Sequence, residues 1–339
     1  MSDHTKTNIV TLTRHVLTEQ YQHQEATGDL TLLLTSIQLG CKFVESCVRK
    51  AALIYLTGLA HQTNVQGEDV KKLDVLANEM FINALKSSGK VAIMVSEEVD
   101  NAIFVEDELR GKYCVTFDPL DGSSNIDAGV NVGTIFGIYQ LRDSSKAEIA
   151  DVLRPGNKMV AAGYCMYGSS CNLILTTGNG VNGYTLDPAI GEFILTHPNI
   201  RIPPRAKIYS VNEGNAMYWD DACKAYFDSI KFPKDPARKP YSARYIGSMV
   251  ADIHRTLLYG GIFAYPADKK SKNGKLRVLY ECFPMAMIVE QAGGRATTGK
   301  TRMLDVVPTD IHARAPIFLG SEEDVKEAEE FFQKYDSLV

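Results

Sequence analysis

Apolar positions in the first ninety residues repeat with the spacing of amphipathic helices. One apolar stripe predicts a long helix over residues 29–55. This stripe consists of Leu30, Leu33, Leu34, Ile37, Cys41, Val44, Val48 and Ala51. A shorter helix is predicted between residues 11 and 23, and another over residues 74–85. The polar, glycine-containing stretch at residues 57–72 is predicted to be a loop.

The pattern then changes to short apolar runs separated by glycine or Asn-Gly, which predict β-strands. These runs occupy residues 91–95, 113–117, 132–139, 159–166, 172–177, 181–186 and 192–196. After the proline-containing segment 197–204, helices and strands alternate again. Interleaved helices and strands predict an α/β protein of layered sheets and helices. The proline-containing segment predicts a boundary between domains at residues 1–200 and 201–339.

Acidic side chains follow two of the predicted strands. Glu97 and Glu98 come after residues 91–95, while Asp118 and Asp121 come after residues 113–117, where Pro119 is expected to end the strand. Ligands of α/β sheets bind beyond the carboxyl ends of strands, so these four carboxylates are expected to converge. Such a cluster needs cations to offset its repulsion, and hard oxygen ligands select Mg²⁺ or Mn²⁺. The ordinary alternative for the two glutamates is a solvated strand end.

The small residues directly after Asp121 predict a phosphate site beside this cluster. Backbone N–H groups of Gly122, Ser123, Ser124 and Asn125 could hold a phosphate, as the beginnings of helices do. Carboxylates for two cations next to a phosphate cradle are the outline of a two-metal phosphate-ester hydrolase.

These acidic motifs resemble those of the metal-dependent, lithium-sensitive sugar and inositol phosphatase superfamily. Four further segments resemble fructose-1,6-bisphosphatases, and they occur in order at residues 70–74, 212–214, 244–252 and 279–281. The resemblance extends from about residue 10 to 335. It implies a layered α/β/α/β/α sandwich and the Mg²⁺-dependent hydrolysis of the 1-phosphate of fructose 1,6-bisphosphate in gluconeogenesis.

The resemblance also implies roles for individual residues. The implied metal ligands are Glu97, Glu98, Asp118, the Leu120 carbonyl, Asp121 and Glu281. They would bind Mg²⁺, with Mn²⁺ or Zn²⁺ as alternatives. Asp74 and Glu98 are the implied catalytic residues that orient and deprotonate the attacking water. A helix N-cap is the alternative role for Asp74. Glu68 stands where the family often carries aspartate.

The implied substrate contacts come from both halves of the chain. They are Gly122, Ser123, Ser124, Asn212, Arg244, Tyr245, Tyr265 and Lys275. Lysine and arginine suit phosphate, and tyrosine offers a hydroxyl on a stiff ring. Arg244 resembles a residue that reaches the substrate of a neighbouring subunit. Each tyrosine could instead be a packing aromatic. Asn215 replaces a tyrosine common in the family, so that contact is not carried over.

The beginning of the first long helix is a candidate anion site, because its free N–H groups and dipole attract negative charge. An ordinary helix start is the alternative. The resemblance places an inhibitory AMP site here, formed by Thr27, Gly28, Asp29, Leu30, Thr31, Lys112 and Tyr113. Gln140 replaces an arginine common at this pocket, and Arg142 lies one strand repeat away. A homotetramer with cooperative AMP inhibition is implied.

Composition narrows the kinds of partner and the cellular compartments that are expected for this protein. The 339 residues include 36 basic and 41 acidic ones, and this acidic balance argues against a nucleic-acid partner. Seven cysteines without a Cys-x-x-Cys pair fit buried free thiols in a reducing compartment. The N-terminus lacks a signal-peptide pattern, and no apolar run is expected to reach the length of a membrane span. A cytoplasmic location without a membrane partner is predicted.

Two alternative functions stay open. One is a related phosphatase acting on inositol monophosphate or sedoheptulose bisphosphate. The pairing of Arg244 with Lys275 argues against a monophosphate, which needs no second anion clamp. The other is a nucleotide-sensing or interaction protein that has lost catalysis. The complete set of implied metal ligands argues against that.

Overall fold

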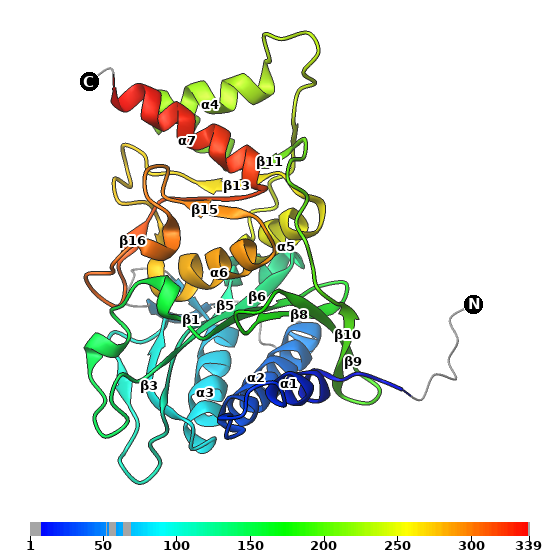
Figure 1. Cartoon of the computed structure of the whole chain (residues 1–339), viewed down its shortest axis with the longest axis vertical. Helices are drawn as coiled ribbons and strands as arrows, with labels where there is room; N and C mark the ends of the chain where they lie inside the picture. Colours follow the sequence, from blue (N-terminus) through cyan, green and yellow to red (C-terminus); the bar gives the residue numbers. More distant parts are fainter. Residues whose placement is uncertain (1–7, 52, 54–58, 64–68, 338–339) are drawn as a thin grey trace.

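Helices and sheets stack in five layers in the computed structural model, which describes residues 8–51, 53, 59–63 and 69–337 (Figure 1). The first layer contains α1 (Leu12–Gln20), α2 (Asp29–Lys50) and α3 (Lys72–Ser87). The third contains α5 (Met249–Tyr259) and α6 (Phe283–Gln291), and the fifth contains α4 (Asp221–Lys231) and α7 (Glu322–Asp336). Sheets form the second and fourth layers, which confirms the predicted α/β/α/β/α sandwich.

The larger sheet has eight strands. In spatial order they are β10 (Glu192–His197), β9 (Asn182–Asp187), β8 (Cys171–Thr176), β7 (Ala161–Tyr167), β6 (Val132–Gln140), β5 (Tyr113–Asp121), β3 (Val91–Ser96) and β4 (Ile103–Phe104). Neighbouring strands are antiparallel except β3 and β5, which are parallel with Val95 opposite Thr116. β3 and β5 therefore end at the same edge of the sheet, as the sequence predicted.

The smaller sheet and several short elements complete the fold. The sheet contains, in spatial order, β12 (Ser242–Ala243), β11 (Ile208–Ser210), β13 (Ile262–Tyr265), β17 (Ile317–Gly320) and β15 (Arg295–Thr297). Two separate strand pairs are β1 (Leu59–Thr63) with β2 (Asp69–Lys71), and β14 (Leu276–Arg277) with β16 (Arg314–Ala315). Short helical turns are η1 (Ser123–Ala128), η2 (Ile149–Asp151), η3 (Gly156–Lys158), η4 (Glu213–Tyr218), the π-helical η5 (Val278–Cys282) and η6 (Met303–Asp305).

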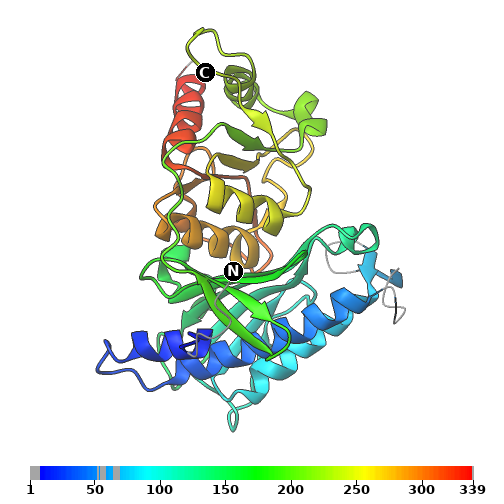
Figure 2. The same ribbon diagram turned by 90° about the vertical axis from the view of Figure 1, so that its right-hand side faces the viewer.

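Apolar cores fill the spaces between the layers. The stripe on α2 packs toward the large sheet, where α2 and α3 run side by side (Figure 2). A second core lies between the large sheet and the helices α5 and α6. It joins Ile93 and Tyr164 of the first half of the chain to Ile253 and Phe283 of the second half. Because each buried aliphatic side chain contributes about 1.5–3 kcal/mol, this shared core fixes the two halves against each other.

The cysteines lie in these cores, in agreement with the sequence. All seven are free thiols, and all except Cys47 are buried. Burial raises the pKa of the Cys114 thiol to about 12 and raises that of Cys282 well above its usual value. These side chains therefore act as small apolar core residues.

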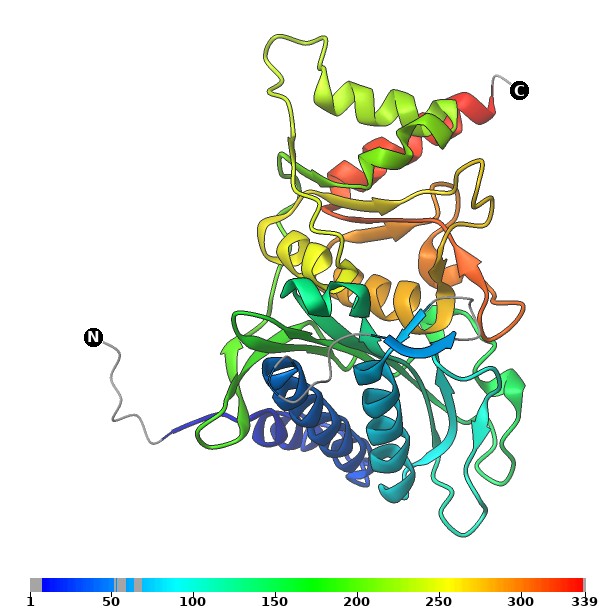
Figure 3. The same cartoon turned by 180° about the vertical axis from the view of Figure 1, so that it is seen from behind.

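The segment between α2 and α3 differs from its prediction as a loop. Its described residues form the antiparallel pair β1–β2, which Figure 3 shows at the beginning of α3. A two-stranded ribbon is held by backbone hydrogen bonds and needs no alternating apolar side chains, so the sequence pattern gave no strand signal. α2 also ends earlier than predicted, at Lys50. Glu68 lies outside the described residues.

Pro119 does not end the strand that carries it. β5 continues to Asp121, and its pairing with β6 shifts from Asp118 opposite Ile135 to Asp121 opposite Gly133. Three steps along β5 therefore face two along β6, which is a β-bulge. The irregular pairing accommodates a residue that has no N–H to donate. The bulge lies between the two aspartates of the acidic motif.

The expectation that no segment reaches the length of a membrane span does not hold for α2. By length and composition alone, this 22-residue helix is apolar enough to cross a membrane. In the structure, Leu33, Ile37 and Val44 are buried in the core beneath the large sheet. A core helix passes the same test of length and composition, and the buried stripe is the pattern of such a helix.

His254 on α5 generates a prediction about stability. Its Nδ1 is hydrogen-bonded to the Tyr164 hydroxyl of β7 at 2.8 Å, and burial lowers the pKa of His254 to about 4. The unfolded chain, with a histidine pKa of about 6.5, takes up the proton first as the pH falls, so folding stability drops between pH 6.5 and 4. We expect this group to lower the free energy of unfolding by about 2 kcal/mol from pH 7 to pH 5.

Denaturant unfolding at both pH values checks this expectation. His254→Gln should lose that part of the pH dependence, whereas His23→Gln, at an exposed position, should keep it. Equal pH dependence in His254→Gln and the wild type would contradict the assignment.

Candidate active site

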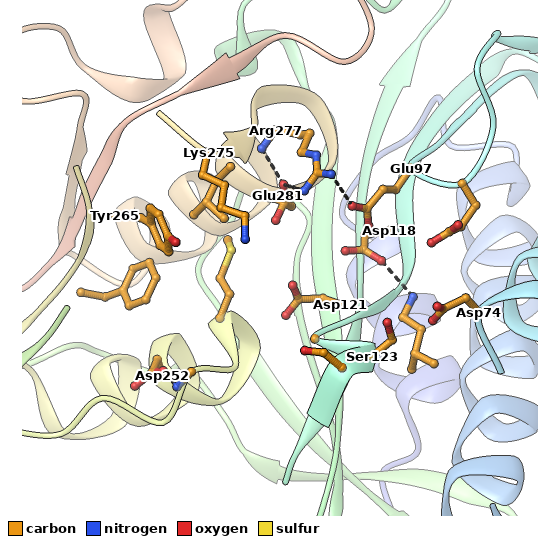
Figure 4. Close-up of a pocket in the computed structure, with 18 of the residues that line it drawn as sticks. Asp74, Glu97, Asp118, Asp121, Ser123, Asp252, Tyr265, Lys275, Arg277 and Glu281 are labelled. Atoms are coloured by element: carbon orange, nitrogen blue, oxygen red, sulfur yellow. Dashed lines mark hydrogen bonds and ion pairs between the residues drawn. The ribbon is translucent and has the colours of Figure 1, made fainter. Parts of the chain in front are cut away.

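A cavity of about 720 Å³ opens where the two halves of the chain meet (Figure 4). From the first half, the end of β5 and the beginning of η1 line it, together with the residues after β3. From the second half come the segment before α5, the end of β13, and residues 275–281. The carboxyl ends of the parallel pair β3 and β5 thus lie at this cavity, where α/β sheets bind ligands.

Three buried carboxylates converge inside the cavity. Asp118, Asp121 and Glu281 each offer an oxygen within 4.8 Å of the others. The aspartates come from the bulged end of β5, and Glu281 comes from η5 (Figure 4). Glu97 and Glu98 line the same cavity. The acidic residues predicted at the two strand ends are therefore brought together, as the sequence analysis expected.

The electrostatics of this cluster favour a bound cation. Burial, followed by the charges of Glu97 and Asp121, raises the pKa of Asp118 well above its usual value. Burial and Glu97 likewise raise the pKa of Asp121 to about 7, and burial raises that of Glu281 to about 8. A cation held by these oxygens would relieve both the desolvation and the repulsion. The residues present therefore fit a divalent metal with hard oxygen ligands.

Arg277 is a residue of this cluster that sequence reasoning missed. Its guanidinium lies 3.1 Å from Glu97 and 3.9 Å from Glu281, and its backbone N–H donates to Glu281 at 2.5 Å. Only 4% of Arg277 is exposed. The available signal was a basic residue just before the apolar stretch 278–280, since a buried arginine needs anionic partners. Arg277 offsets part of the cluster's negative charge.

The loop after Asp121 forms the neighbouring wall. Gly122 has a φ of 76° and is the N-cap of η1, and it lines the cavity together with Ser123 and Ser124. This left-handed conformation suits glycine, which has no Cβ to clash. The Asn125 amide donates to the Gly247 carbonyl at 3.1 Å, so the loop is tied directly to the second half of the chain.

The remaining predicted catalytic residues also line the cavity. Asp74 is buried in the first turn of α3, inside the helix that begins at Lys72, so it is not the N-cap. Glu98 is among the residues that line the cavity. Leu120 lines it as well, and its backbone N–H donates to Asp118 at 2.9 Å.

Three of the predicted substrate residues line the cavity from the second half of the chain, whereas two others lie elsewhere. Tyr245, Tyr265 and Lys275 line the cavity. Burial, with Tyr265 as the next cause, raises the pKa of Tyr245 to about 12, so its hydroxyl keeps its proton as a hydrogen-bond donor. Asn212 instead caps η4 by accepting from the Gly214 N–H, and it lines a small adjoining hollow. Arg244 is exposed and donates to the carbonyl of the preceding residue.

The predicted AMP residues gather at the beginning of α2. Gly28 is the N-cap, with a φ of 81°, and Asp29 begins the helix. Asp29 lies 2.9 Å from Lys112 and 2.8 Å from Lys90, and it accepts from the Thr27 hydroxyl at 2.6 Å. The lysines and Thr27 hold the pKa of Asp29 well below its usual range, with Lys90 the largest cause. Lys90 is a second residue that sequence reasoning missed.

The other predicted AMP residues also lie near the beginning of α2. The Thr31 hydroxyl donates to Gln20 at 2.9 Å, and Leu30 follows Asp29 in the first turn. Tyr113 is buried, and the Lys112 ammonium lies 5.6 Å from the centre of its ring. Two cations and a helix beginning thus lie at one place, which suits an anion.

Arg142 does not stand in for an arginine at position 140. Gln140 is the last residue of β6 and lies opposite Tyr113. Arg142 lies beyond the strand end, so the expected offset of one strand repeat is wrong. Its guanidinium binds Asp151 at 2.7 Å and Glu148 at 3.5 Å. Asp151 also accepts a hydrogen bond from the Arg142 backbone N–H at 3.2 Å.

Comparisons with known proteins agree with this geometry. The family model for the fructose-1,6-bisphosphatase N-terminal domain matches residues 10–198, and that for the C-terminal domain matches residues 202–333. Cytosolic fructose-1,6-bisphosphatase of Oryza sativa subsp. indica is 65% identical over 326 residues, which cover 96% of each chain. The Arabidopsis thaliana protein of the same name is 64% identical over 96% of this chain and 95% of its own.

A solved structure shows the same fold over nearly the whole chain. The holo form of Leishmania major fructose-1,6-bisphosphatase superposes with a TM-score of 0.91 at 47% identity, covering 96% of this chain and 99% of its own. Its apo form gives a TM-score of 0.86. With both family models matched and the acidic cavity in place, this chain belongs to the fructose-1,6-bisphosphatase family of phosphoric monoester hydrolases.

Proposed function

We propose that this protein removes the 1-phosphate of fructose 1,6-bisphosphate, giving fructose 6-phosphate and phosphate, as a cytosolic enzyme of gluconeogenesis. The observation that carries the proposal is the shape of one cavity with two chemically different ends. Asp118, Asp121 and Glu281 converge at one end, while Lys275 and Tyr265 line the other. The relatives named as cytosolic fructose-1,6-bisphosphatases support both the substrate and the location.

In this proposal the domain of residues 1–200 supplies most of the metal ligands, and the domain of residues 201–339 binds the sugar. Glu97, Glu98, Asp118, the Leu120 carbonyl, Asp121 and Glu281 would hold Mg²⁺, with Mn²⁺ or Zn²⁺ as alternatives. Their oxygen atoms are the ligands that Mg²⁺ prefers. When bound, the metal supplies an activated water and stabilises the leaving oxygen. The protein positions the reacting groups around it.

The protein's side chains and backbone activate the water and bind the substrate. Asp74 and Glu98 orient the attacking water and accept its proton. Gly122, Ser123 and Ser124 hold the 1-phosphate through N–H and hydroxyl groups. Tyr245, Tyr265, Lys275 and Asn212 bind the sugar and the 6-phosphate. The protonated hydroxyl of Tyr245 supports a donor role toward phosphate oxygen.

Phosphate release from fructose 1,6-bisphosphate tests this proposal. We expect release with Mg²⁺ and none with a chelator, because the carboxylate cluster needs the cation. Asp121→Asn should lower kcat by about 100-fold or more, since it alters a metal ligand while keeping the side-chain shape. Asp107→Asn, at an exposed position that pairs with Arg110, is the matched control and should behave as the wild type. Full activity of Asp121→Asn would refute the assignment.

We also propose that AMP inhibits the enzyme by binding at the beginning of α2. Thr27, Gly28, Asp29, Leu30 and Thr31 would surround the phosphate, with Lys112 and Tyr113 completing the site. The two lysines beside Asp29 support an anion here, because phosphate could take over the ion pair with Lys112. Gln140 offers no charge in place of the family's common arginine, which favours weaker AMP binding.

The inhibition constant of AMP, measured by phosphate release, tests this site. Lys112→Gln should raise the inhibition constant of AMP about tenfold, the value of one lost charge-assisted hydrogen bond. Lys86→Gln removes a lysine that pairs with Glu106 and should leave AMP inhibition as in the wild type. An equal inhibition constant in Lys112→Gln would place AMP elsewhere.

A homotetramer is proposed as the working assembly, with Arg244 reaching the substrate of a neighbouring subunit. Leu32, Leu39, Phe43 and Ile190 are large apolar side chains that are between 38% and 54% exposed in the single chain, which supports burial against another copy. Light scattering should give about four times the chain mass of 37.4 kDa. Arg244→Ala should raise KM for the substrate about tenfold. A monomeric mass, or an unchanged KM, would contradict this assembly.

A further inference from the structure

We infer that Asp252 is a positioning residue for substrate binding, whose carboxylate fixes the irregular segment that carries Tyr245 and Gly247 into the cavity. This segment, residues 244–248, lies between the end of β12 and the beginning of α5. The inference rests on the proposed function, in which this wall of the cavity contacts the sugar and its second phosphate. Figure 4 shows Asp252 on the α5 side of the pocket, apart from the metal-binding carboxylates.

The carboxylate of Asp252 collects hydrogen bonds from three separate parts of the fold. It accepts from the backbone N–H of Ile246 at 3.1 Å and from that of Gly247 at 3.0 Å. It also accepts from the Ser210 hydroxyl of β11 at 2.7 Å and from the Arg255 guanidinium at 2.9 Å. Asp252 is fully buried. It therefore connects the segment to the small sheet and to its own helix.

A carboxylate suits this position because both of its oxygens can accept hydrogen bonds. The peptide groups of Ile246 and Gly247 belong to no helix or strand, so their N–H groups need another acceptor. Without that acceptor, the two N–H groups would have no hydrogen-bond partner, which costs free energy. The path of the segment consequently depends on one side chain.

Gly247 shows how closely the segment is fitted. Its φ of 84° lies in the left-handed region, which residues with a Cβ rarely adopt. In this conformation its N–H donates to Asp252 while its carbonyl accepts from Asn125 of η1 at 3.1 Å. One residue thus links the proposed phosphate loop to the proposed sugar wall. Asp252 holds Gly247, and with it the segment that carries Tyr245, in place on the sugar-binding wall.

The same contacts argue against a direct chemical role. Asp252 lines the cavity, but both of its oxygens already accept hydrogen bonds from donors of this chain. Asp121, at the metal-binding end, accepts instead from the Val250 N–H near the beginning of α5. Asp252 therefore acts through Tyr245 and Gly247, and its loss should weaken binding without slowing the chemical step.

Steady-state kinetics of Asp252→Asn test the inference. Asparagine keeps the shape but replaces one acceptor oxygen with a donor, so the N–H groups of residues 246 and 247 lose part of their acceptor. We expect KM for fructose 1,6-bisphosphate and the inhibition constant of fructose 6-phosphate to rise about tenfold, with kcat within about twofold. The inhibition constant of inorganic phosphate, which binds at the other end, should stay within about twofold.

The control is Asp228→Asn on α4, where the aspartate is exposed and pairs with Lys231. It should match the wild type in every constant. An unchanged KM in Asp252→Asn, or a fall in kcat alone, overturns the inference. A parallel rise for phosphate and fructose 6-phosphate also overturns it, because general loosening of the fold would affect both ends.

A second variant decides the matter if Asp252→Asn does not fold. Gly247→Ala has open space for its methyl group, with Tyr245 3.8 Å away, but it strains the left-handed backbone that presents the N–H to Asp252. It should show the same rise in KM with kcat preserved, and an unchanged KM overturns the inference. A wild-type enzyme that releases no phosphate from fructose 1,6-bisphosphate would instead refute the proposed function on which the inference rests.

Discussion

Repulsion among buried carboxylates is the constraint on which the rest of this structure depends. Asp118, Asp121 and Glu281 lie close together, and burial, with the charge of Glu97 added, raises the pKa of each. Folding tolerates this arrangement because a rigid frame holds it, with the parallel strands β3 and β5 on one side and η5 on the other. Arg277 offsets only part of the charge. The remaining negative charge attracts cations, so the feature that costs stability also suits a metal-dependent phosphatase.

The cavity works because it lies between two halves that cannot slide past each other. The core between the large sheet and α5 and α6 contains residues of both halves, and Tyr164 is hydrogen-bonded to His254 across it. The hydrogen bond from Asn125 to Gly247 crosses the same junction directly at the site. A two-ended substrate needs a fixed distance between its binding ends, because misplacement by about an ångström costs reaction rate. The layered sandwich provides that distance.

In the proposed function, AMP would bind on the α2 side of the large sheet, away from the active-site cavity. The candidate anion site at the beginning of α2 shares β5 with the carboxylate cluster, since Tyr113 begins that strand and Asp121 ends it. β5 therefore runs from the candidate anion site to the carboxylates. The exposed apolar face of α2 would couple the same helix to other subunits.

The sequence by itself determined the class of the fold, most helices and strands, and the acidic residues that converge, because periodicity and strand-end position are local properties of the chain. It also placed Asp29 and Lys112 together through family resemblance. Only the tertiary structure decided the features that depend on contacts between residues distant in the sequence. Examples are the bulge that carries β5 past Pro119, the burial of Arg277 among glutamates, and the partners of Arg142 and Asp252. These side chains meet groups that lie far along the chain or beyond a turn, and no local pattern encodes such contacts.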